Sequence, residues 1–572
     1  MTTPTNLVVA KNVAVPMRDG TVLRADVYRP AEGRHPVLVM RTPYSKDVPY
    51  GLMVVLNYVR AAEAGYVVVV QDVRGRFQSE GEFVPFVNEG ADGYDTVEWA
   101  AAQDWSSGSV GMFGSSYMAA TQLQAAATSP PHLCAIAPME GSADYFEGRS
   151  YKGGAFELGA LLSISLFALS PGSIQRRGLR GEPFRRIWRD VRAFLEDLPG
   201  MASTAPLTDL KQTVLGEWAP FFFDWMDHDA PDPYWDSMSV AAAHEKIAVP
   251  ALHVSSWFDT YAVGAIANYL GIKSKGATLE ARENQYLWLG PWGHYMPRTV
   301  LNGVARLGDM NFGLGALVDL DLVQLAWFDR WLKHDVTAWS FRSPVRLFFL
   351  GANTWREEAA WPVPADVKPF FLAHDGKLSV RPASASPPDV YRSDPARPVP
   401  TLGGAHLMLE SAFPQGPWRQ NAIEERDDVV VYTTDPLADD VDVIGVVTLE
   451  AWVTSSAPST DVAAMLNVVR ADGRSINLVD GIRRAELPGD QPAKVIVELG
   501  PIAHRFSAGE RIRLRIAGSN FPRHDLNPHT GGRPSTATTR LVAEDQIHHD
   551  DSHRSALLLP VVAGTLDGLE HA

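Results

Sequence analysis

Strand-like apolar runs alternate with helix-forming segments through residues 1–143, and this alternation constrains the fold more than any other feature. Residues 35–40 and 66–70 have the character of buried strands, as expected where both faces of a sheet are covered. Residues 91–103 and 117–128 have helical patterns, and the second is rich in Ala and stops before two prolines. Such alternation predicts a parallel sheet flanked by helices, so the expected fold class is α/β.

The expected secondary structure changes twice in the rest of the chain. Residues 144–240 contain long helical segments without strands between them, which predicts a helical cap inserted into the sheet domain. Strand-like runs return within residues 241–342, which therefore continue that domain. Residues 343–572 contain short β-type runs separated by Pro, Gly and Asp clusters, which predicts a C-terminal β jelly-roll sandwich. We expect residues 345–350 to form the first strand of this sandwich.

The segment Gly114-Ser115-Ser116-Tyr117-Met118 lies between an expected strand and the Ala-rich helix. A nucleophilic serine on such a turn needs small neighbours, because its backbone is strained and adjacent segments pack closely. The usual pattern is Gly-x-Ser-x-Gly, and Met118 replaces the second Gly here. On its own the Gly-x-Ser match is weak, since a plain strand-to-helix turn explains it at least as well.

Two residues later in the chain strengthen the hypothesis that Ser116 is a nucleophile. Asp259 follows the strand-like run 250–255, and His294 follows the run 286–289. In α/β-hydrolases the serine, the acid and the histidine occur in this order, each just beyond a strand. We therefore predict a triad in which His294 takes the hydroxyl proton and Asp259 orients the imidazole. The alternatives are a loop cap for the aspartate and a surface position for the histidine.

An acyl-transfer site also needs donors for the oxyanion of the tetrahedral intermediate. The backbone amide of Tyr117, which follows the predicted nucleophile, would be one donor. The second should come from the loop after an early strand, where residues 41–46 contain no Gly-rich turn. Tyr44 offers a phenol hydroxyl in that loop, although packing is the commoner role for such an aromatic residue.

Composition argues against several classes of function. The net charge of −16 argues against a nucleic-acid partner, because phosphate recognition needs clustered Lys and Arg. The single cysteine, Cys134, excludes an intrachain disulfide framework and is expected to be a buried strand residue. Residues 1–14 lack a secretory signal pattern and no apolar run has membrane-spanning length, so we expect a cytoplasmic protein without a membrane partner. No cofactor or metal is expected, and homo-oligomerisation stays open.

Together these motifs resemble the cocaine esterase and X-Pro dipeptidyl-peptidase (CocE/NonD) family of serine hydrolases, which includes α-amino acid ester hydrolases and glutaryl acylases. The matching segments are residues 17–20, 41–44, 72–76, 79–81, 92–95, 111–117, 257–259, 290–294 and 518–523. The resemblance implies an α/β-hydrolase core, a helical cap and a C-terminal jelly roll. It also implies that the Tyr44 hydroxyl and the Tyr117 amide form the oxyanion hole. Ala119 and Arg419 depart from the family pattern, which has Gly and Asp at those positions.

The expected substrate is a small carboxylic ester, or alternatively an amide, cleaved through an acyl-Ser116 intermediate. Within the family, the alternatives are an X-Pro dipeptidyl-peptidase and an α-amino acid ester hydrolase or β-lactam acylase. A more remote alternative is a non-catalytic binding protein on the same fold. Phe258 and Tyr261, which flank Asp259, are candidate walls of the substrate pocket.

Two further groups of polar residues have ordinary structural interpretations. The segment 224–236 contains aspartates that could grip a substrate ammonium group, although helix capping is the favoured role in its Asp-Pro-rich turns. The aspartates concerned are Asp227, Asp229, Asp232 and Asp236. His549 and His553 have the spacing of a helical metal-ligand pair, but their Asp-rich surroundings predict a solvated loop.

Overall fold

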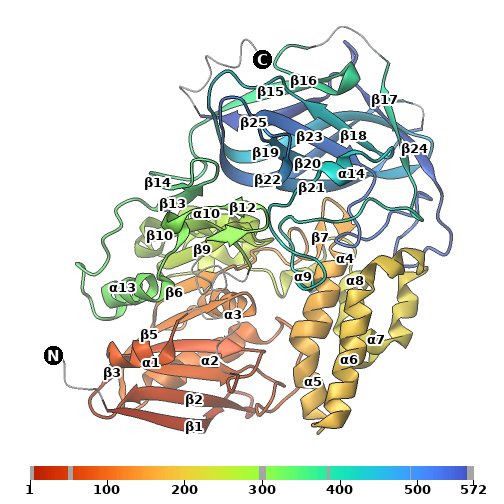
Figure 1. Cartoon of the computed structure of the whole chain (residues 1–572). Coiled ribbons are helices and arrows are strands. Elements are labelled where there is room, and N and C mark those ends of the chain that lie inside the picture. The colour runs from red at the N-terminus through yellow and green to blue at the C-terminus, as the bar shows by residue number, and fades with distance from the viewer. Residues whose placement is uncertain (1–5, 49–55, 295–304, 383–386, 490, 563–572) are drawn as a thin grey trace.

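The computed structural model of the 572-residue chain describes residues 6–48, 56–294, 305–382, 387–489 and 491–562. Figure 1 shows a sheet domain flanked by helices, a group of helices beside it, and a β-rich domain that packs against both. The predicted α/β core with a C-terminal β-rich domain is therefore confirmed. The jelly-roll topology of the last part and the boundaries of the cap stay predictions.

A ten-stranded sheet organises the first domain, with the order β1-β2-β4-β3-β5-β6-β9-β10-β13-β14. The seven strands from β4 to β13 in that order are mutually parallel, whereas β1, β2 and β14 run antiparallel to their neighbours. The strands are β1 (Leu7–Pro16), β2 (Val22–Pro30), β3 (His35–Thr42), β4 (Val67–Asp72), β5 (Ser106–Ser115), β6 (Leu133–Met139), β9 (Ala251–Phe258), β10 (Gln285–Gly293), β13 (Val345–Phe349) and β14 (Thr354–Glu358).

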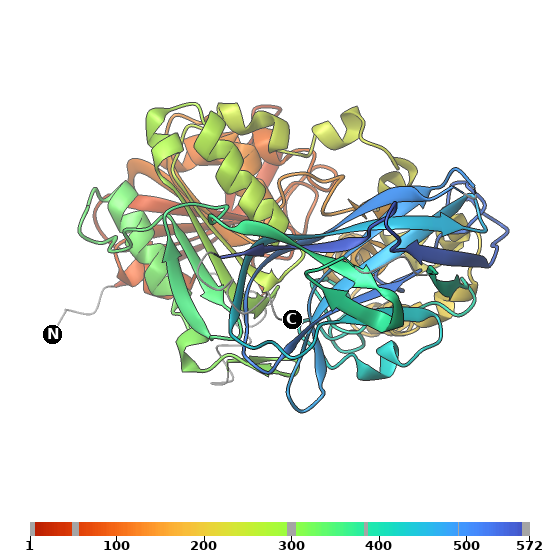
Figure 2. The same ribbon diagram turned by 90° about the horizontal axis from the view of Figure 1, so that it is seen from above.

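Alternate residues along β3 face two different layers of helices. Val37 and Val39 pack with residues of α2, α3 and α10, whereas Leu38 and Met40 pack with residues of α1 and α13. Because both faces are covered, the strand is apolar at every one of these positions. Figure 2 shows helices on both sides of the sheet. The helices are α1 (Tyr58–Glu63), α2 (Glu89–Ala101), α3 (Tyr117–Ala126), α10 (Ala262–Lys275) and α13 (Leu320–Leu332).

The strand expected at residues 345–350 belongs to this sheet, so its assignment to the sandwich is wrong. β13 pairs in parallel with β10, with Val345 opposite Leu287, and β14 folds back on it as the edge strand. A short apolar strand has the same pattern in either sheet, and only its pairing partner distinguishes the two. The second sheet begins with β15 (Asp366–Ala373).

The β-rich domain contains an 11-stranded hydrogen-bonded network. Its apolar core is continuous with that of the first domain, because Leu289 and Leu347 belong to the same buried cluster as Val447 and Leu466. The two domains are therefore expected to unfold together. After β15 the strands are β16 (Lys377–Ser379), β17 (Asp389–Ser393), β18 (Val429–Thr433), β19 (Val441–Ser455), β20 (Ser459–Val469), β21 (Ser475–Glu486), β22 (Ala493–Phe506), β23 (Arg511–Ala517), β24 (Ala543–His548) and β25 (Ala556–Val561).

Between β6 and β9 the chain forms mainly helices, where the cap was expected. They stand beside the sheet domain and below the β-rich domain in the view of Figure 1. One continuous helix, Leu158–Arg176, is long and apolar enough to cross a membrane, but 67% of its most apolar 18-residue stretch is buried, and a core helix meets the same criteria. The elements are β7 (Tyr151–Lys152), β8 (Ala155–Phe156), α4 (Leu158–Ser163), α5 (Ser170–Arg176), α6 (Glu182–Glu196), α7 (Val214–Trp218), α8 (Phe221–Asp227) and α9 (Pro233–Asp236).

Buried charges join the cap to the β-rich domain. The guanidinium of Arg523 lies 3.3 Å from Glu157, at the start of α4, and 2.6 Å from Asp480 on β21. At Gly153, which has a φ of 54°, an added Cβ would lie 2.1 Å from the Ile482 carbonyl oxygen. Removing one partner of such a buried pair leaves an uncompensated charge, so the contacts specify this junction. The 518–523 segment thus has a structural role.

Candidate active site

Ser116 occupies the sharp turn between β5 and α3. Its φ of 63° and ψ of −123° are rare for a residue with a side chain and indicate a strained backbone. Gly114 relieves the crowding on the opposite side of this turn, because a Cβ there would lie 2.5 Å from Cβ of Met118. This turn, the nucleophile elbow, therefore accommodates Met118 in place of the second Gly as long as residue 114 remains glycine.

Four polar side chains follow four strands that are adjacent in the sheet. Ser116 follows β5, Glu140 follows β6, Asp259 follows β9 and His294 follows β10. Because parallel strands end at one edge of the sheet, these residues converge there. The structure thus brings the three predicted triad residues to a common edge and adds a carboxylate, Glu140, that the sequence analysis did not single out.

The predicted acid and base of the triad are in contact. Nδ1 of His294 lies 3.1 Å from Oδ1 of Asp259. The Ser255 hydroxyl and the Tyr261 backbone amide each donate a hydrogen bond of 3.2 Å to the Asp259 carboxylate. Both triad side chains are buried, with 5% of His294 and 2% of Asp259 exposed. This arrangement favours a proton on Nδ1, the tautomer in which Nε2 serves as the base.

Glu140 places a second buried carboxylate beside the imidazole. Its Oε2 lies 3.7 Å from Nδ1 of His294 and also accepts a hydrogen bond from the Ser115 hydroxyl. Burial and the nearby charge of Asp259 raise the pKa of Glu140, whereas the charge of His294 opposes this shift and stabilises the carboxylate. Burial alone would lower the pKa of His294, but the charges of Glu140 and Asp259 outweigh it and raise this pKa to about 9. The second carboxylate therefore favours the imidazolium that forms during acyl transfer.

Replacing Glu140 with Gln is expected to move the acid limb of the kcat/KM profile to lower pH. The substitution removes one of two negative charges that stabilise the imidazolium, so His294 would remain neutral, and able to act as a base, at lower pH. The measurement is kcat/KM for a 4-nitrophenyl ester across the pH range. Glu283→Gln makes the same charge change on an exposed residue and should leave the limb in place. An unmoved limb in Glu140→Gln would contradict the assignment.

The phenol of Tyr44 reaches the predicted nucleophile. It hydrogen-bonds to the side chain of Ser116, and the backbone amide of Tyr117 donates to its oxygen. Burial raises the pKa of Tyr44, so the hydroxyl stays protonated and able to donate. Arg76 fixes this loop against the cap, because it donates to the carbonyl of Pro43 at 2.9 Å and to that of Leu169 at 2.7 Å.

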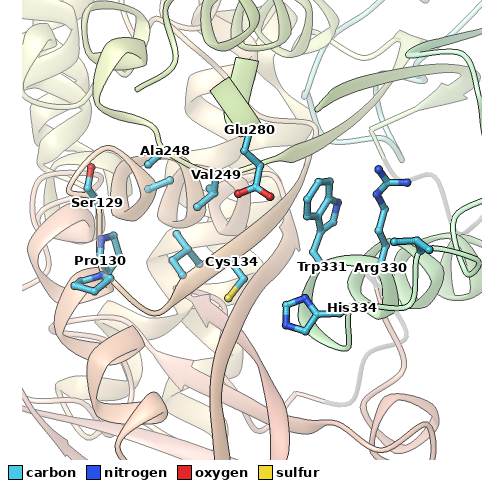
Figure 3. A pocket seen from close by; sticks show the side chains of 13 residues that line it. Ser129, Pro130, Cys134, Ala248, Val249, Glu280, Arg330, Trp331 and His334 are labelled. Carbon is cyan, nitrogen blue, oxygen red and sulfur yellow. The ribbon is translucent and has the colours of Figure 1, made fainter. Parts of the chain in front are cut away.

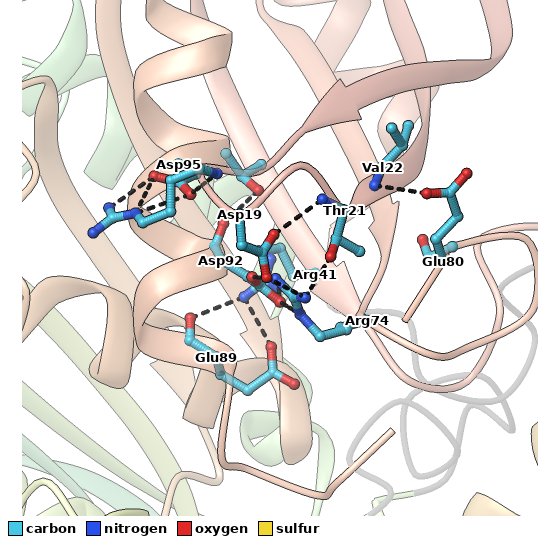
Figure 4. A network of polar contacts seen from close by, with 12 residues as sticks. Asp19, Thr21, Val22, Arg41, Arg74, Glu80, Glu89, Asp92 and Asp95 are labelled. Atoms are coloured by element: carbon cyan, nitrogen blue, oxygen red, sulfur yellow. Dashed lines mark hydrogen bonds and ion pairs between the residues drawn. The ribbon is translucent and has the colours of Figure 1, made fainter. Parts of the chain in front are cut away.

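The side chain of Tyr117 is anchored away from the nucleophile. Its hydroxyl donates to Glu89 at 2.9 Å and accepts from the backbone amide of Phe86 at 2.8 Å, and its ring stacks on Phe86 at 4.2 Å. Glu89 in turn pairs with the buried guanidinium of Arg41 at 2.8 Å, as Figure 4 shows. These contacts fix the orientation of the Tyr117 backbone amide.

The segment 72–76, one of those that match the family, has a structural role near the site. Arg74 contacts Asp92 at 2.6 Å and Asp19 at 2.7 Å, and both contacts belong to the network in Figure 4. The backbone amide of Lys46 donates to Asp72 at 2.7 Å. Charged hydrogen bonds of this kind hold the loop that carries Tyr44 against the sheet.

The comparisons with known proteins agree with this geometry. Residues 19–296 match the X-Pro dipeptidyl-peptidase (S15 family), and residues 337–558 match the X-Pro dipeptidyl-peptidase C-terminal non-catalytic domain. A cocaine esterase from Rhodococcus sp. (strain MB1 Bresler) is 37% identical over 586 residues, which cover 97% of this chain and 99% of that protein. The chain belongs to the cocaine esterase and X-Pro dipeptidyl-peptidase (S15) family. It is accordingly a serine hydrolase of the ester-cleaving type.

Solved structures share the fold of this S15-family enzyme along nearly its whole length. An α-amino acid ester hydrolase labelled with selenomethionine has a TM-score of 0.83 at 24% identity, with 97% of each chain covered. An aminopeptidase from the marine sediment archaeon Thaumarchaeota archaeon has a TM-score of 0.80 at 23% identity, with 98% of each chain covered. At these identities the likeness concerns the fold alone.

The β-rich domain of the S15-family enzyme reaches the site through Gln415. Its side-chain oxygen accepts a hydrogen bond of 3.1 Å from the backbone amide of His294. A Cβ on Gly293 would lie 2.5 Å from that oxygen, so glycine is needed beside the histidine. Arg419, one of the two family departures, bonds Asn421 at 2.9 Å in the exposed part of the same loop. The sequence analysis noted Arg419 but gave no signal for Gln415.

Of the two candidate pocket residues, Tyr261 and Phe258, only the first lies at the site. The ring of Tyr261 lies 5.5 Å from that of His294, which places it at the site. Phe258 is fully buried and stacks on Phe312 at 6.3 Å in the core shared with the β-rich domain, so the structure does not bring it to Tyr261's side of the site. The methyl group of Ala119 has room because its neighbour, Gly141, has no side chain. A Cβ on Gly141 would lie 3.1 Å from this methyl group.

Within residues 224–236 the aspartates cap a helix, form ion pairs or lie exposed, in agreement with the favoured structural interpretation. Asp232 accepts a hydrogen bond of 2.9 Å from the Tyr234 amide and caps α9. Asp229 pairs with Arg533 at 2.6 Å, and Asp227 lies 3.9 Å from Lys211. The fourth, Asp236, is exposed.

Two groups of metal-type ligands occur within the described ranges, each with donor atoms within 4.8 Å of one another. One contains Glu140, Asp259 and His294 of the site itself. The other contains His374, Asp389 and His549, where Asp389 accepts hydrogen bonds from His549 at 3.1 Å and from the Tyr432 hydroxyl. His549 is 2% exposed, so its assignment to a solvated loop is wrong. Its aspartate partner is distant in sequence and could not be found from the local pattern.

A surface pocket of about 490 Å³, shown in Figure 3, lies at the amino ends of the parallel strands, whereas Ser116 follows the carboxyl end of β5. Its lining includes Leu133 and Val249, at the amino ends of β6 and β9, together with Trp331. Cys134 also lines it and is half-buried, in contrast to the buried position expected. This pocket is remote from the strand ends that carry the triad.

Proposed function

We propose that this enzyme hydrolyses a carboxylic ester through an acyl intermediate on Ser116. The observation that carries the proposal is the 3.1 Å contact of His294 with Asp259, at the sheet edge where Ser116 occupies a strained elbow. His294 accepts the hydroxyl proton as the serine oxygen bonds to the carbonyl carbon, and then gives it to the departing alcohol. Water repeats the sequence, which releases the acid and regenerates the serine.

The Tyr44 hydroxyl and the Tyr117 amide are proposed to stabilise the oxyanion in both steps. The Tyr117 amide donates to the phenol oxygen of Tyr44, so the two donors lie side by side next to the serine. An oxyanion bound between them would accept one hydrogen bond from each. Because both donors are held by buried contacts, little reorganisation is needed as charge develops.

Replacing Tyr44 with Phe is expected to reduce kcat by about 10²–10³-fold, since it removes one oxyanion donor and keeps the ring. The KM should change much less, because the lost hydrogen bond strengthens only in the transition state. Steady-state kinetics with a 4-nitrophenyl ester measure both constants. Tyr28→Phe removes a phenol hydroxyl from a partly buried ring and serves as the control. An unchanged kcat in Tyr44→Phe would return this residue to a packing role.

Labelling with a fluorophosphonate probe tests the nucleophile directly. The adduct is expected on Ser116, and peptide mapping by mass spectrometry locates it. Ser116→Ala should abolish labelling, whereas Ser115→Ala, which alters the adjacent hydroxyl, should retain it. An adduct on Ser115, or no adduct on the folded protein, would overturn the proposal.

Ester cleavage is favoured over release of X-Pro dipeptides. A dipeptidyl-peptidase must hold a free ammonium group, and Asp229 and Asp232 of the cap are engaged with Arg533 and the α9 terminus. The similarity to a cocaine esterase also supports ester chemistry. Assays of 4-nitrophenyl esters against Gly-Pro-4-nitroanilide compare the two activities. Anilide cleavage without ester turnover would promote the peptidase alternative.

The proposal needs a small-molecule substrate and the chain's own residues, with no cofactor, nucleic acid or membrane. A cytoplasmic location, expected from the sequence, is part of the same proposal and is measured by cell fractionation. Self-association is not required, because the triad and the oxyanion donors come from one chain.

A further inference from the structure

Arg149 is a buried cation in an aromatic cage. It follows β6 in the chain and precedes β7, and only 3% of it is exposed. Its guanidinium carbon lies 4.3 Å from the ring centre of Trp225, 4.8 Å from that of Phe86 and 5.4 Å from that of Tyr145. The aromatic faces offset part of the cost of burying the charge.

The hydrogen bonds of this guanidinium are incomplete. Nη1 donates to the Ser150 hydroxyl at 3.0 Å, whereas Nε and Nη2 are buried and have no partner among the described residues. No carboxylate among the described residues forms an ion pair with it. Within the part of the chain that the structure describes, the guanidinium therefore lies buried without an anionic partner.

The comparison with Arg76, another buried guanidinium near the site, shows what is unusual. Nε and Nη2 of Arg76 donate to the carbonyls of Pro43 and Leu169, so those nitrogens are used to hold the fold. Nε and Nη2 of Arg149 donate to no backbone carbonyl of the described residues. Nε and Nη2 form one edge of a guanidinium, the edge that grips a carboxylate with two parallel hydrogen bonds.

Arg149 belongs to the wall of the active site. Its guanidinium lies within hydrogen-bonding reach of the Tyr261 hydroxyl, and the ring of Tyr261 lies 5.5 Å from that of His294. Its charge also acts on Tyr44, the predicted oxyanion donor. The aromatic cage continues to Tyr117, because Phe86 stacks on Tyr117 and also packs at a tilt against Tyr145, with ring centres 4.5 Å apart. A group bound at Arg149 is therefore close to an acyl chain on the nucleophile.

We propose that Arg149 binds a carboxylate carried by the acyl group of the substrate, so that preferred substrates are half-esters of dicarboxylic acids. The inference rests on the ester hydrolysis proposed above and specifies its substrate class. The carboxylate completes the hydrogen bonds of Nε and Nη2 and neutralises the buried charge. The aromatic rings around it contact the methylene chain between the two carboxyl groups.

The test compares two esters that differ only in the distal group. Mono-4-nitrophenyl adipate carries a free carboxylate, and 4-nitrophenyl methyl adipate carries a neutral methyl ester in its place. The enzyme is expected to show a kcat/KM roughly 10–100-fold higher for the first, the effect of a charge-assisted hydrogen-bond pair. Arg149→Met should bring the ratio of the two kcat/KM values close to one. A preference for the neutral ester in the unaltered enzyme would overturn the inference.

Two further variants separate recognition from folding. Arg149→Lys keeps the positive charge but loses the two parallel N–H donors of the guanidinium. Its preference for the ester with a free carboxylate should therefore be intermediate. Arg177→Met is the matched control, because Arg177 also stacks on a cap tryptophan, Trp218, at 4.5 Å but is exposed. It should leave both rates unchanged. If Arg149→Met lowered the rates for both esters equally, Arg149 would be a structural residue.

A binding readout that needs no turnover completes the test. Adipate should raise the melting temperature of the unaltered protein and not that of Arg149→Met, because a ligand that binds only the folded state stabilises it. A shift of equal size in both proteins would contradict the proposed site.

The position of the charge is tested with 4-acetoxybenzoate and its methyl ester, in which the carboxylate lies on the leaving group. A preference there, and none with the adipates, would overturn the assignment to the acyl side. Failure of fluorophosphonate labelling at Ser116 would instead remove the proposed function itself. Labelling at Ser116 with no preference between the adipates would leave that function intact and overturn only the role of Arg149.

Discussion

Replacing Ser116 with Ala is expected to reduce kcat by about 10⁵–10⁶-fold, the largest effect of any single substitution in this enzyme. The hydroxyl is the only part removed, so the acyl intermediate cannot form. The residual rate comes from substrate binding and the oxyanion donors. Alanine keeps a Cβ at the strained φ of 63°, and the elbow should fold as before. The measurement is kcat for a 4-nitrophenyl ester at saturating substrate.

Two controls make this result specific. Ser115→Ala removes the adjacent hydroxyl, which bonds Glu140, and should leave most of the activity. The melting temperatures of both variants should match that of the unaltered protein within a few degrees. A kcat above about 1% of the unaltered value in well-folded Ser116→Ala would be incompatible with covalent catalysis at this serine.

The three residues predicted to form a triad lie at strand ends, as the local patterns of the sequence indicate. Ser116, Asp259 and His294 each come directly after a strand that the sequence marks clearly. Chain order supplied the rest, since strand ends in a parallel sheet share an edge. Glu140 also follows a strand directly, so the same rule would have found it, but no motif drew attention to it.

Other parts of the site depend on contacts between distant segments. Gln415 lies 121 residues from the histidine that it contacts, and no local pattern links the two. The cage of Arg149 combines Phe86, Tyr145 and Trp225 from three separate segments. A lone arginine in the sequence carries no sign that its hydrogen bonds are incomplete, because that property depends on what packs around it.

The errors in the fold have a similar origin. The pattern of residues 345–350 correctly indicates a strand, but the choice of sheet depends on pairing with β10. Phe258 was placed at the pocket because it neighbours Asp259. Successive side chains of a strand point to opposite faces, so adjacency in sequence does not place two residues on one side of a site.

Replacing Asp259 with Asn is expected to reduce kcat by about 10⁴-fold. Asparagine fits the space of the carboxylate but can present an N–H to Nδ1 of His294, which favours the tautomer with its proton on Nε2. That tautomer cannot accept the proton of Ser116. The loss should appear in kcat, with KM little altered, because the carboxylate acts on the imidazole and not on the substrate.

Glu140 makes this prediction more demanding, because a second carboxylate lies 3.7 Å from the same nitrogen. If Asp259 is the acid of the triad, Glu140→Gln shifts the pH profile and lowers the kcat plateau far less than Asp259→Asn does. If Glu140 can replace it, Asp259→Asn alone loses little and only the double variant shows the full loss. The double-mutant cycle distinguishes the two cases through its coupling energy. The shorter contact of 3.1 Å and the Ser255 and Tyr261 hydrogen bonds favour Asp259.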